Sequence, residues 1–325
     1  MEPTRHEALW FSTGDLVLST NTYLFKVHKE ILALQSSVFR DMIEFPTVDI
    51  SVEDARLVGH ENGAGSAPDR DEGLPLVALS GDEGKDVAHL LKAIYYREYY
   101  DRDNDETPLE TIIALLVLGN KYDFKHICKE VTKQLSRHYP NTLDGFDDVD
   151  GDGHHSYLFG KLRYLCHVPL LEACHTANVA VLLPSLYYAC AGFKLAWSYE
   201  QVDEIGGLHA DCLRTLLIGK SGLDLALHKF IASLPDEFRN ISCSFCKVDA
   251  YISQLHQQLE DYNSYLSSNT GHRLSRAVLE NGCQKCSAKF VARIDAKREK
   301  IWEKIPSYFG FPGWDELQER SEENA

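Results

Sequence analysis

Two pairs of cysteines in the second half of the chain have the spacing of zinc-binding knuckles. Cys243 and Cys246 form one C-x2-C pair, Cys283 and Cys286 form the other, and 36 residues separate them. Four thiolates can surround one zinc ion tetrahedrally, because a two-residue spacer lets both sulfurs of a pair face one point. The separation exceeds the roughly 15 to 20 residues of common paired-knuckle sites, but a helical hairpin would close it. The sequence offers two interpretations: one structural zinc ion without a catalytic role, or four thiols packed as small apolar side chains.

Two further motifs resemble ligand-binding loops, and each fails at a decisive position. The run from Asp148 to Gly153 begins like a calcium-binding EF-hand loop, but the twelfth position, normally a glutamate, is Phe159. We expect a solvated acidic linker there. Gly219-Lys220-Ser221 resembles the end of a phosphate-binding loop, but Arg214 stands where the first glycine belongs. We interpret that segment as a helix end capped by Gly219.

A basic segment near the C-terminus is the part of the chain most compatible with nucleic acid. Its cations are Lys285, Lys289, Arg293, Lys297, Arg298, Lys300 and Lys304, and its apolar stripe is Phe290, Ile294, Ile301, Trp302 and Ile305. We favour a solvated helix face over a nucleic-acid site. The acidic residues expected to neutralise it are Asp315, Glu316, Glu319, Glu322 and Glu323.

Composition limits the classes of function. The chain has 325 residues, 44% of them hydrophobic, and a formal net charge of -16, which disfavours nucleic acid and anionic lipid as partners. Its first residues do not resemble a signal sequence, and no stretch approaches the ~20 apolar residues of a membrane span. Nine cysteines spread over a long chain suit a reducing compartment. We expect an intracellular protein, cytoplasmic or nuclear, that is not membrane-bound.

The predicted secondary structure differs between the two halves of the chain, and the first half contains both strands and helices. Apolar runs at 16–18 and 23–27 predict a β-hairpin, and helical spacing from Ile31 to Ile43 predicts two helices, the second capped by Ser36 and Ser37. A Gly- and Asp-rich insertion follows at 46–73. The pattern then predicts a strand at 74–79 and helices at 87–95, 109–119 and 124–139.

The second half is helical in pattern, which makes the fold class α+β with an all-α C-terminal domain. The expected helices lie near 156–166, 169–180, 184–197, 208–218, 222–232, 247–267, 273–281 and 287–304. The predicted divisions are a tail at 1–9, an N-terminal domain at 10–139, an acidic linker at 140–155, a helical domain at 156–314 and an acidic tail at 315–325.

Three segments of the first half carry a family resemblance. They are Gly14-Asp15-Leu16-Val17-Leu18, Phe25-Lys26-Val27-His28-Lys29-Glu30-Ile31-Leu32, and Ser36-Ser37-Val38-Phe39-Arg40-Asp41-Met42. Together they closely resemble the signature of the BTB/POZ domain over roughly residues 10 to 138. The ending from Trp302 to Trp314 is similar, more weakly, to that of fungal BTB proteins with a helical C-terminal region.

The resemblance implies a small sheet with a helical cluster, in which the signature residues are structural. These are Asp15, Val27, His28, Lys29, Leu32, Ser36 and Phe39. Asp15 and His28 are placed where a carboxylate and an imidazole could form a buried pair that holds the first helix. A catalytic dyad would also need a nucleophile and an oxyanion site, which the sequence does not show.

The resemblance also implies partners. It predicts a homodimer or hetero-oligomer formed through residues near Trp10 to Leu34, and for some family members a cullin-type ubiquitin ligase scaffold. Recruitment of a cullin uses a hydrophobic-x-Glu motif, whereas this chain has Val48-Asp49-Ile50 in that neighbourhood. The expected function is a non-enzymatic protein-interaction adaptor, with a ubiquitin ligase substrate adaptor as the first candidate. The alternative is a transcriptional or chromatin regulator that uses the basic helix.

Overall fold

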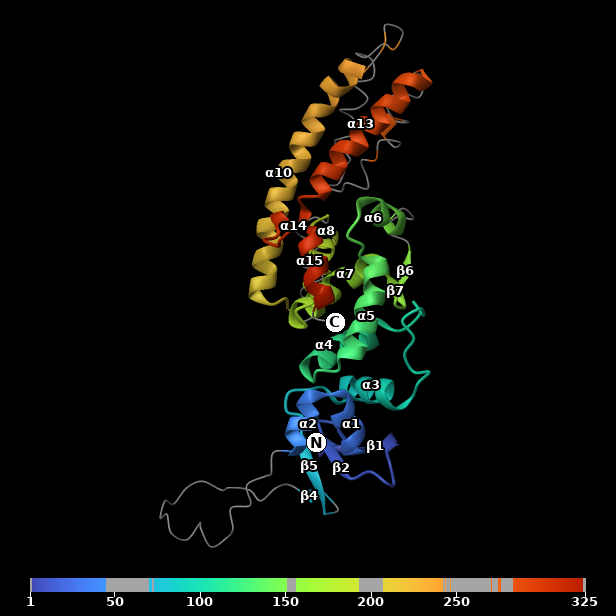
Figure 1. Cartoon of the computed structure of the whole chain (residues 1–325), viewed down its shortest axis with the longest axis vertical. Coiled ribbons are helices and arrows are strands. Elements are labelled where there is room, and N and C mark those ends of the chain that lie inside the picture. Colours follow the sequence, from blue (N-terminus) through green and yellow to red (C-terminus); the bar gives the residue numbers. More distant parts are fainter. Residues whose placement is uncertain are drawn as a thin grey trace, which may run out of the picture. The chain divides into compact units, whose positions relative to one another are not determined.

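A computed structural model of the chain shows a mixed α and β protein that divides into two compact units (Figure 1). It describes residues 2–44, 70–71, 73–150, 156–192, 207–241, 243, 246, 270, 274–275 and 283–323. The units are Met1–Val131 and Thr132–Ala325. The division therefore falls inside helix α5 (Lys125–His138) rather than in the expected linker at 140–155. Within the described ranges, the helices are too short or too polar to cross a membrane.

A small mixed sheet forms the base of the first unit. Its strands are β1 (Thr4–Trp10), β2 (Leu16–Ser19), β3 (Tyr23–Val27), β4 (Arg70–Asp71) and β5 (Leu74–Ala78), in the order β1-β3-β2-β5-β4. Strands β2 and β3 form the predicted antiparallel hairpin, with Leu16 opposite Val27. Strand β5 confirms the predicted strand at 74–79 and pairs in parallel with β2. Most of the predicted insertion, residues 46–69 and 72, lies outside the described residues.

The predicted N-terminal tail is wrong, because residues 4–10 form the edge strand β1. Thr4 and Arg5 pair in parallel with Tyr23 and Leu24 of β3. Leu9 is completely buried. Strand β1 buries only Leu9, whose neighbours Ala8 and Trp10 are also apolar, so it lacks the alternation by which a strand is recognised. The pairing with β3 defines this strand.

The helices of the first unit follow the predicted pattern. They are α1 (Lys29–Gln35), α2 (Ser37–Glu44), α3 (Gly84–Tyr95), α4 (Leu109–Lys121) and the first part of α5. Helix α4 is buried around most of its circumference, and Ile112, Leu115 and Leu116 have no exposed surface. This burial agrees with its apolar composition on nearly all sides.

Helices dominate the second unit, together with one short hairpin. Its elements are α6 (Leu143–Asp150), β6 (Tyr157–Leu158), β7 (Lys161–Leu162), α7 (Arg163–Thr176), α8 (Leu183–Ala191), α10 (Ala210–Ile241), α13 (Gln284–Trp302), α14 (Ile305–Tyr308) and α15 (Trp314–Glu323). The predicted helix at 156–166 is wrong in its first part, because β6, β7 and the turn between them span 157–162 and α7 begins only at Arg163. The unit is therefore not purely helical.

Two segments predicted to be solvated are helices with a buried side. In the supposed acidic linker, Phe146 of α6 packs against Tyr188, with ring centroids 5.0 Å apart, and against Trp302 at 5.3 Å. In the supposed acidic tail, Leu317 of α15 is buried. Amphipathic helices tolerate many acidic residues on the outer face, so composition alone gave the wrong prediction at both places.

Helix α10 replaces the two helices predicted at 208–218 and 222–232. Gly219 is not a C-cap but lies in the middle of α10, where a β-carbon would overlap the ring of Phe309. The glycine is needed for close packing rather than for ending the helix. The predicted helix at 287–304 is confirmed as α13. The predicted helix at 247–267 lies outside the described residues, as does most of the one at 273–281.

Candidate metal centre

The two cysteine pairs lie together where α10 ends and α13 begins. Ile241 is the last residue of α10, and Cys283 is the N-cap of α13. The metal-ligating sulfurs of the four cysteines all lie within 4.8 Å of one another. The Sγ of Cys243 lies 3.7 Å from that of Cys246 and 3.8 Å from that of Cys283. The folded chain thus brings together two pairs that are distant in sequence.

Each pair folds into the same small turn. The backbone N–H of Cys246 donates to the carbonyl of Cys243 at 3.0 Å, and that of Cys286 donates to the carbonyl of Cys283 at 3.0 Å. These turns direct both sulfurs of a pair to one side. The N–H of Cys243 also donates to the Sγ of Cys286 at 3.3 Å, which joins the two turns. An N–H donor to sulfur stabilises a thiolate.

Two of the sulfur separations match the edge of a tetrahedral metal site. A zinc–sulfur bond of about 2.3 Å places the corners of a regular tetrahedron about 3.8 Å apart. The separations measured from Cys243 are 3.7 and 3.8 Å. Four sulfur ligands at this spacing suit zinc, and such a site has no open position for a substrate.

Without a cation, the thiol of Cys286 resists ionisation. Contact with Cys283 is the main cause that raises the pKa of Cys286, to about 12, and burial adds to it. A bound dication reverses this preference, because it stabilises the thiolate form directly. Four sulfur donors at this range could therefore bind a divalent metal.

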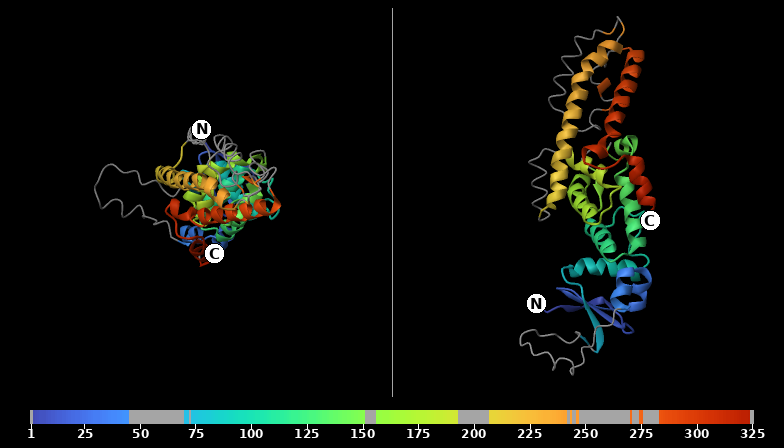
Figure 2. Two further views of the ribbon diagram at one scale, coloured as in Figure 1. Left: turned by 90° about the horizontal axis from the view of Figure 1, so that it is seen from above. Right: turned by 60° about the vertical axis from the view of Figure 1, so that its left-hand side comes forward.

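Helices α10 and α13 run side by side below the cluster, as Figures 1 and 2 both show. The buried residues between them are Phe230, Leu234, Phe238, Leu274, Phe290 and Ile294. The rings of Phe238 and Phe290 meet edge to face at 5.2 Å. This contact lies close to the cysteine turns in sequence, so it sets the spacing of the two helix ends.

An ion-pair cluster adds to this contact. The carboxylate of Glu237 lies 2.5 Å from Nε of Arg293 and 2.7 Å from Nζ of Lys297. The hydrogen bond from Lys297 is the main cause that lowers the pKa of Glu237. Glu237 gives no signal in the sequence, because nothing local pairs it with residues some 60 positions away.

The remaining cysteines behave as buried apolar side chains. Cys166, Cys174, Cys190 and Cys212 are buried, and Cys128 is half-buried. Burial raises the pKa of Cys212 to about 12 and that of Cys128 to about 11. Thiols that hold their protons so strongly are poor nucleophiles.

Asp15 and His28 do not form the expected buried pair, and each supports the start of α1 separately. Asp15 is partly exposed, and its Oδ1 accepts a hydrogen bond from the N–H of Lys29 at 2.9 Å. The ring Nε2 of His28 lies 2.9 Å from the hydroxyl of Thr13, and the His28 N–H donates to the hydroxyl of Tyr95 at 2.9 Å. The carboxylate satisfies an N–H that the helix leaves free, so no imidazole partner is needed.

The other signature residues occupy structural positions. Val27 ends β3 and is fully buried, as is Leu32 of α1. Ser36 caps α2, since its Oγ accepts from the N–H of Phe39 at 2.9 Å and donates to the carbonyl of Tyr122 at 2.5 Å. Ser36 therefore provides the cap that the sequence predicted.

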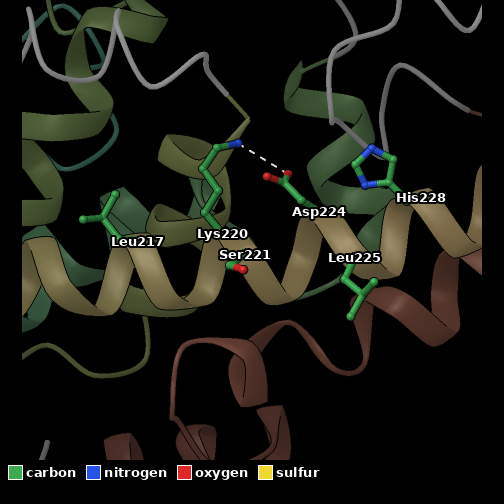
Figure 3. A pocket seen from close by; sticks show the side chains of 6 residues that line it. All are labelled: Leu217, Lys220, Ser221, Asp224, Leu225 and His228. Atoms are coloured by element: carbon green, nitrogen blue, oxygen red, sulfur yellow. Dashed lines mark hydrogen bonds and ion pairs between the residues drawn. The ribbon is translucent and has the colours of Figure 1, made fainter.

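The segment that resembled a phosphate-binding loop lies along the surface of α10. Figure 3 shows the shallow pocket there, which is lined by Leu217, Lys220, Ser221, Asp224, Leu225 and His228. The Lys220 amine is already engaged, donating to the carbonyl of Ala191 at 2.7 Å and lying 3.4 Å from Asp224. Lys220 thus satisfies the C-terminal end of α8, as basic residues often do.

Two further predictions concern the segment that resembles a calcium-binding loop and the charges of the basic helix. Asp148 and Asp150 are part of α6, and residues 151–153 of the supposed calcium loop lie outside the described residues. The expected neutralisation of the basic helix by the acidic tail is replaced by other pairs: Glu237 contacts Arg293 and Lys297, and Asp147 contacts Arg298.

Comparison with known proteins adds no family. No family model, no curated protein and no solved structure matches this chain.

Proposed function

We propose that this chain is a non-enzymatic, intracellular protein-interaction adaptor that self-associates through its N-terminal unit and carries a zinc-braced helical hairpin in its C-terminal unit. The proposal follows the resemblance of the N-terminal segments to the BTB/POZ signature. The order of elements supports it: a hairpin, two helices, a strand and then helices, with His28 at the junction of β3 and α1. All nine cysteines are free, which suits a reducing compartment.

The observation that carries the interaction role is an apolar side chain displayed to solvent on α1. Leu34 is 87% exposed, and α1 buries only Leu32. Met42 of α2 and Tyr96 after α3 are also exposed large apolar residues. Strand β1 lies at the edge of the sheet, where another strand could pair with backbone groups other than those of Ala8, which bond to His6 and Tyr96. An exposed leucine and a sheet edge within one unit each favour association with another polypeptide.

Size measurement of the full chain by light scattering during gel filtration tests self-association. We expect a particle of at least twice the monomer mass of 36.8 kDa. Leu34→Asp should shift it towards the monomer, because a buried carboxylate opposes association. The matched control is Gln35→Asp, which adds the same charge at the neighbouring exposed position and should not dissociate the particle. A monomer at all concentrations, or equal dissociation by both variants, contradicts the proposal.

Recruitment of a cullin is the finer form of this proposal. Val48-Asp49-Ile50, which stands where the family's cullin motif is expected, lies outside the described residues. Binding of a purified cullin N-terminal domain to the full chain would support the ligase-adaptor role. Absence of binding at high micromolar concentration would remove that role and leave the general adaptor proposal standing. The alternative of a chromatin regulator gains no specific support, because α13 already directs several cations to carboxylates.

We also propose that Cys243, Cys246, Cys283 and Cys286 bind one structural zinc ion. The carrying observation is the agreement between the sulfur separations and the edge of a zinc–sulfur tetrahedron. Elemental analysis of the purified full chain should find one zinc per chain. Cys286→Ser should lose the metal, whereas the control Cys128→Ser, outside the cluster, should keep it. No bound zinc, even after zinc is added to reduced protein, contradicts the assignment.

A further inference from the structure

The four thiols of the cluster differ in their access to solvent. Cys246 and Cys286 are buried, whereas Cys243 and Cys283 keep solvent-accessible surface. The two accessible thiols come from different pairs, and their sulfurs lie 3.8 Å apart. A structural zinc site needs only to bind its metal stably, which does not require ligands that are open to solvent. A site with two exposed, adjacent sulfurs also lets a small oxidant reach neighbouring ligands.

We propose that this cluster is a peroxide-responsive zinc centre in which Cys243 and Cys283 join in a disulfide and release the metal. The proposal rests on the zinc site proposed above. It adds an oxidant, hydrogen peroxide, and assigns different roles to the exposed and the buried cysteines.

The chemistry balances with one peroxide for each disulfide. The thiolate of Cys243 or Cys283 attacks peroxide, which breaks the O–O bond, forms a sulfenic acid and releases hydroxide. The second thiolate attacks the sulfenyl sulfur, the S–O bond breaks, and another hydroxide leaves as the S–S bond forms. Two electrons pass from the sulfurs to peroxide, and two protons taken up from the buffer convert both hydroxides to water. The sulfurs need to approach from 3.8 Å to the 2.0 to 2.1 Å of a disulfide.

Metal release follows because the ligand count falls by half. Only the thiolates of Cys246 and Cys286 remain for zinc, and two ligands hold the ion far less tightly than four. The new bond links the same two chain segments as the metal did, from the end of α10 to the start of α13. The oxidised protein therefore loses zinc but keeps its helices tied. A dithiol reductant and zinc should restore the original state.

The test uses full-length protein shown by elemental analysis to hold one zinc. Hydrogen peroxide is added, released zinc is followed with a coloured chelator, and disulfides are mapped by mass spectrometry of unreduced peptides. We expect one zinc released per chain, in step with a Cys243–Cys283 disulfide, and recovery with dithiothreitol and zinc. Retained zinc under these conditions, or disulfides formed within each pair (Cys243 with Cys246, Cys283 with Cys286), overturns the proposal. Protein that never binds zinc fails at the first measurement, which separates failure of the zinc site from failure of the redox response.

A substitution that keeps the ligand but removes the sulfur sharpens the result. Cys283→His offers zinc an imidazole nitrogen and cannot form the disulfide. Its zinc release by peroxide should be at least tenfold slower than that of the parent. The control Cys128→Ser, which removes a half-buried thiol outside the cluster, should release zinc at the parental rate. If Cys283→His releases zinc as fast as the parent, the proposal is wrong. If Cys283→His fails to bind zinc, disulfide mapping in the parent protein decides whether the proposal stands.

Discussion

The two halves of α10 are held in different ways. Its first half packs against α8 and α14, where Gly219 lets the ring of Phe309 lie directly on the helix. Its second half packs against α13, through a cluster centred on Phe238 and Phe290. Leu274, from the segment between the two helices, is fully buried in the same cluster. The second half adds the Glu237 ion pairs and the four-cysteine cluster at its end.

The contrast between the two halves of α10 indicates where a cross-link contributes to stability. Stability from burial grows with the apolar area removed from water, and a helical hairpin removes less than a helix surrounded by others. Small or thin cores are commonly reinforced by metals or disulfides. The cysteine cluster lies at the end of the contact between α10 and α13, whereas the cysteines of α7 and α8 are fully or almost fully buried and serve as packing.

Loss of the metal should cause the largest loss of stability, and the second half of α10 should be the region destabilised. Cys286→Ser is expected to lower the free energy of unfolding of this region by more than about 4 kcal/mol, since structural zinc contributes about 10 to 16 kcal/mol of binding free energy in small domains. Thermal unfolding followed by circular dichroism should show an early transition absent from the parent. Cys128→Ser is the control, and equal behaviour of the two variants would contradict the comparison.

Arg298→Ala should cause the second largest loss of stability, because it breaks a buried ion pair between α13 and α6. Arg298 Nη2 donates to both oxygens of Asp147 at 2.7 Å, and Nη1 donates to Asp295 at 3.0 Å. Removing one partner of a buried pair costs about 3 to 5 kcal/mol, and Asp147 is partly exposed, so we expect about 2 to 4 kcal/mol. Urea unfolding measures it. The control is Arg293→Ala, an exposed arginine expected to lose less than about 1 kcal/mol.

The effect of Arg298→Ala should also depend on pH. Burial raises the pKa of Asp147, and Arg298 opposes this shift. Without the arginine, the folded-state pKa rises further, and a raised carboxyl pKa means that stability is lost as pH rises above the unfolded value. The variant should therefore be closer to the parent at pH 5 than at pH 8. A difference independent of pH would show that Asp147 is not left with an unpaired charge.

In the first half of α10, Gly219→Ala should destabilise by about 1 to 2 kcal/mol. The added methyl overlaps the Phe309 ring, and overpacking costs about 1 to 3 kcal/mol, partly offset by the better helix propensity of alanine. Gly222→Ala is a matched control, because its β-carbon would lie 3.2 Å from Cδ1 of Tyr308, a contact that a small shift relieves. Chemical unfolding should find it close to neutral. If both variants behave alike, Gly219 has no special packing role.

The smallest effect is expected for Glu237→Gln, about 1 kcal/mol at neutral pH, because its partner Arg293 is largely exposed. The pKa of Glu237 is lowered from its ordinary 4.5, chiefly by Lys297. A depressed carboxyl pKa stabilises the fold above the ordinary value, and the contribution is lost as pH falls through the folded-state pKa. The difference between variant and parent should therefore shrink in acid. Glu319→Gln, on the exposed face of α15, should show no such trend.

Local patterns in the sequence predicted the hairpin, helices α1 to α5 and the two cysteine knuckles, because each depends on residues a few positions apart. They did not predict β1, whose pairing with β3 defines it, or α6, whose aspartates hide the buried Leu143 and Phe146. Gly219 was misread because the reason for a glycine there is Phe309, which is remote in sequence. Glu237 was missed for the same reason. Contacts between distant residues decide these cases.

Hydrogen exchange on the full-length protein, with and without a zinc chelator under reducing conditions, tests the central claim most directly. If zinc holds together the end of α10 and the start of α13, chelation should remove protection from residues 230–241 and 284–297. Residues 212–223 should stay as protected as before. Unchanged protection in the second half of α10, or an equal loss along the whole helix, would contradict the account.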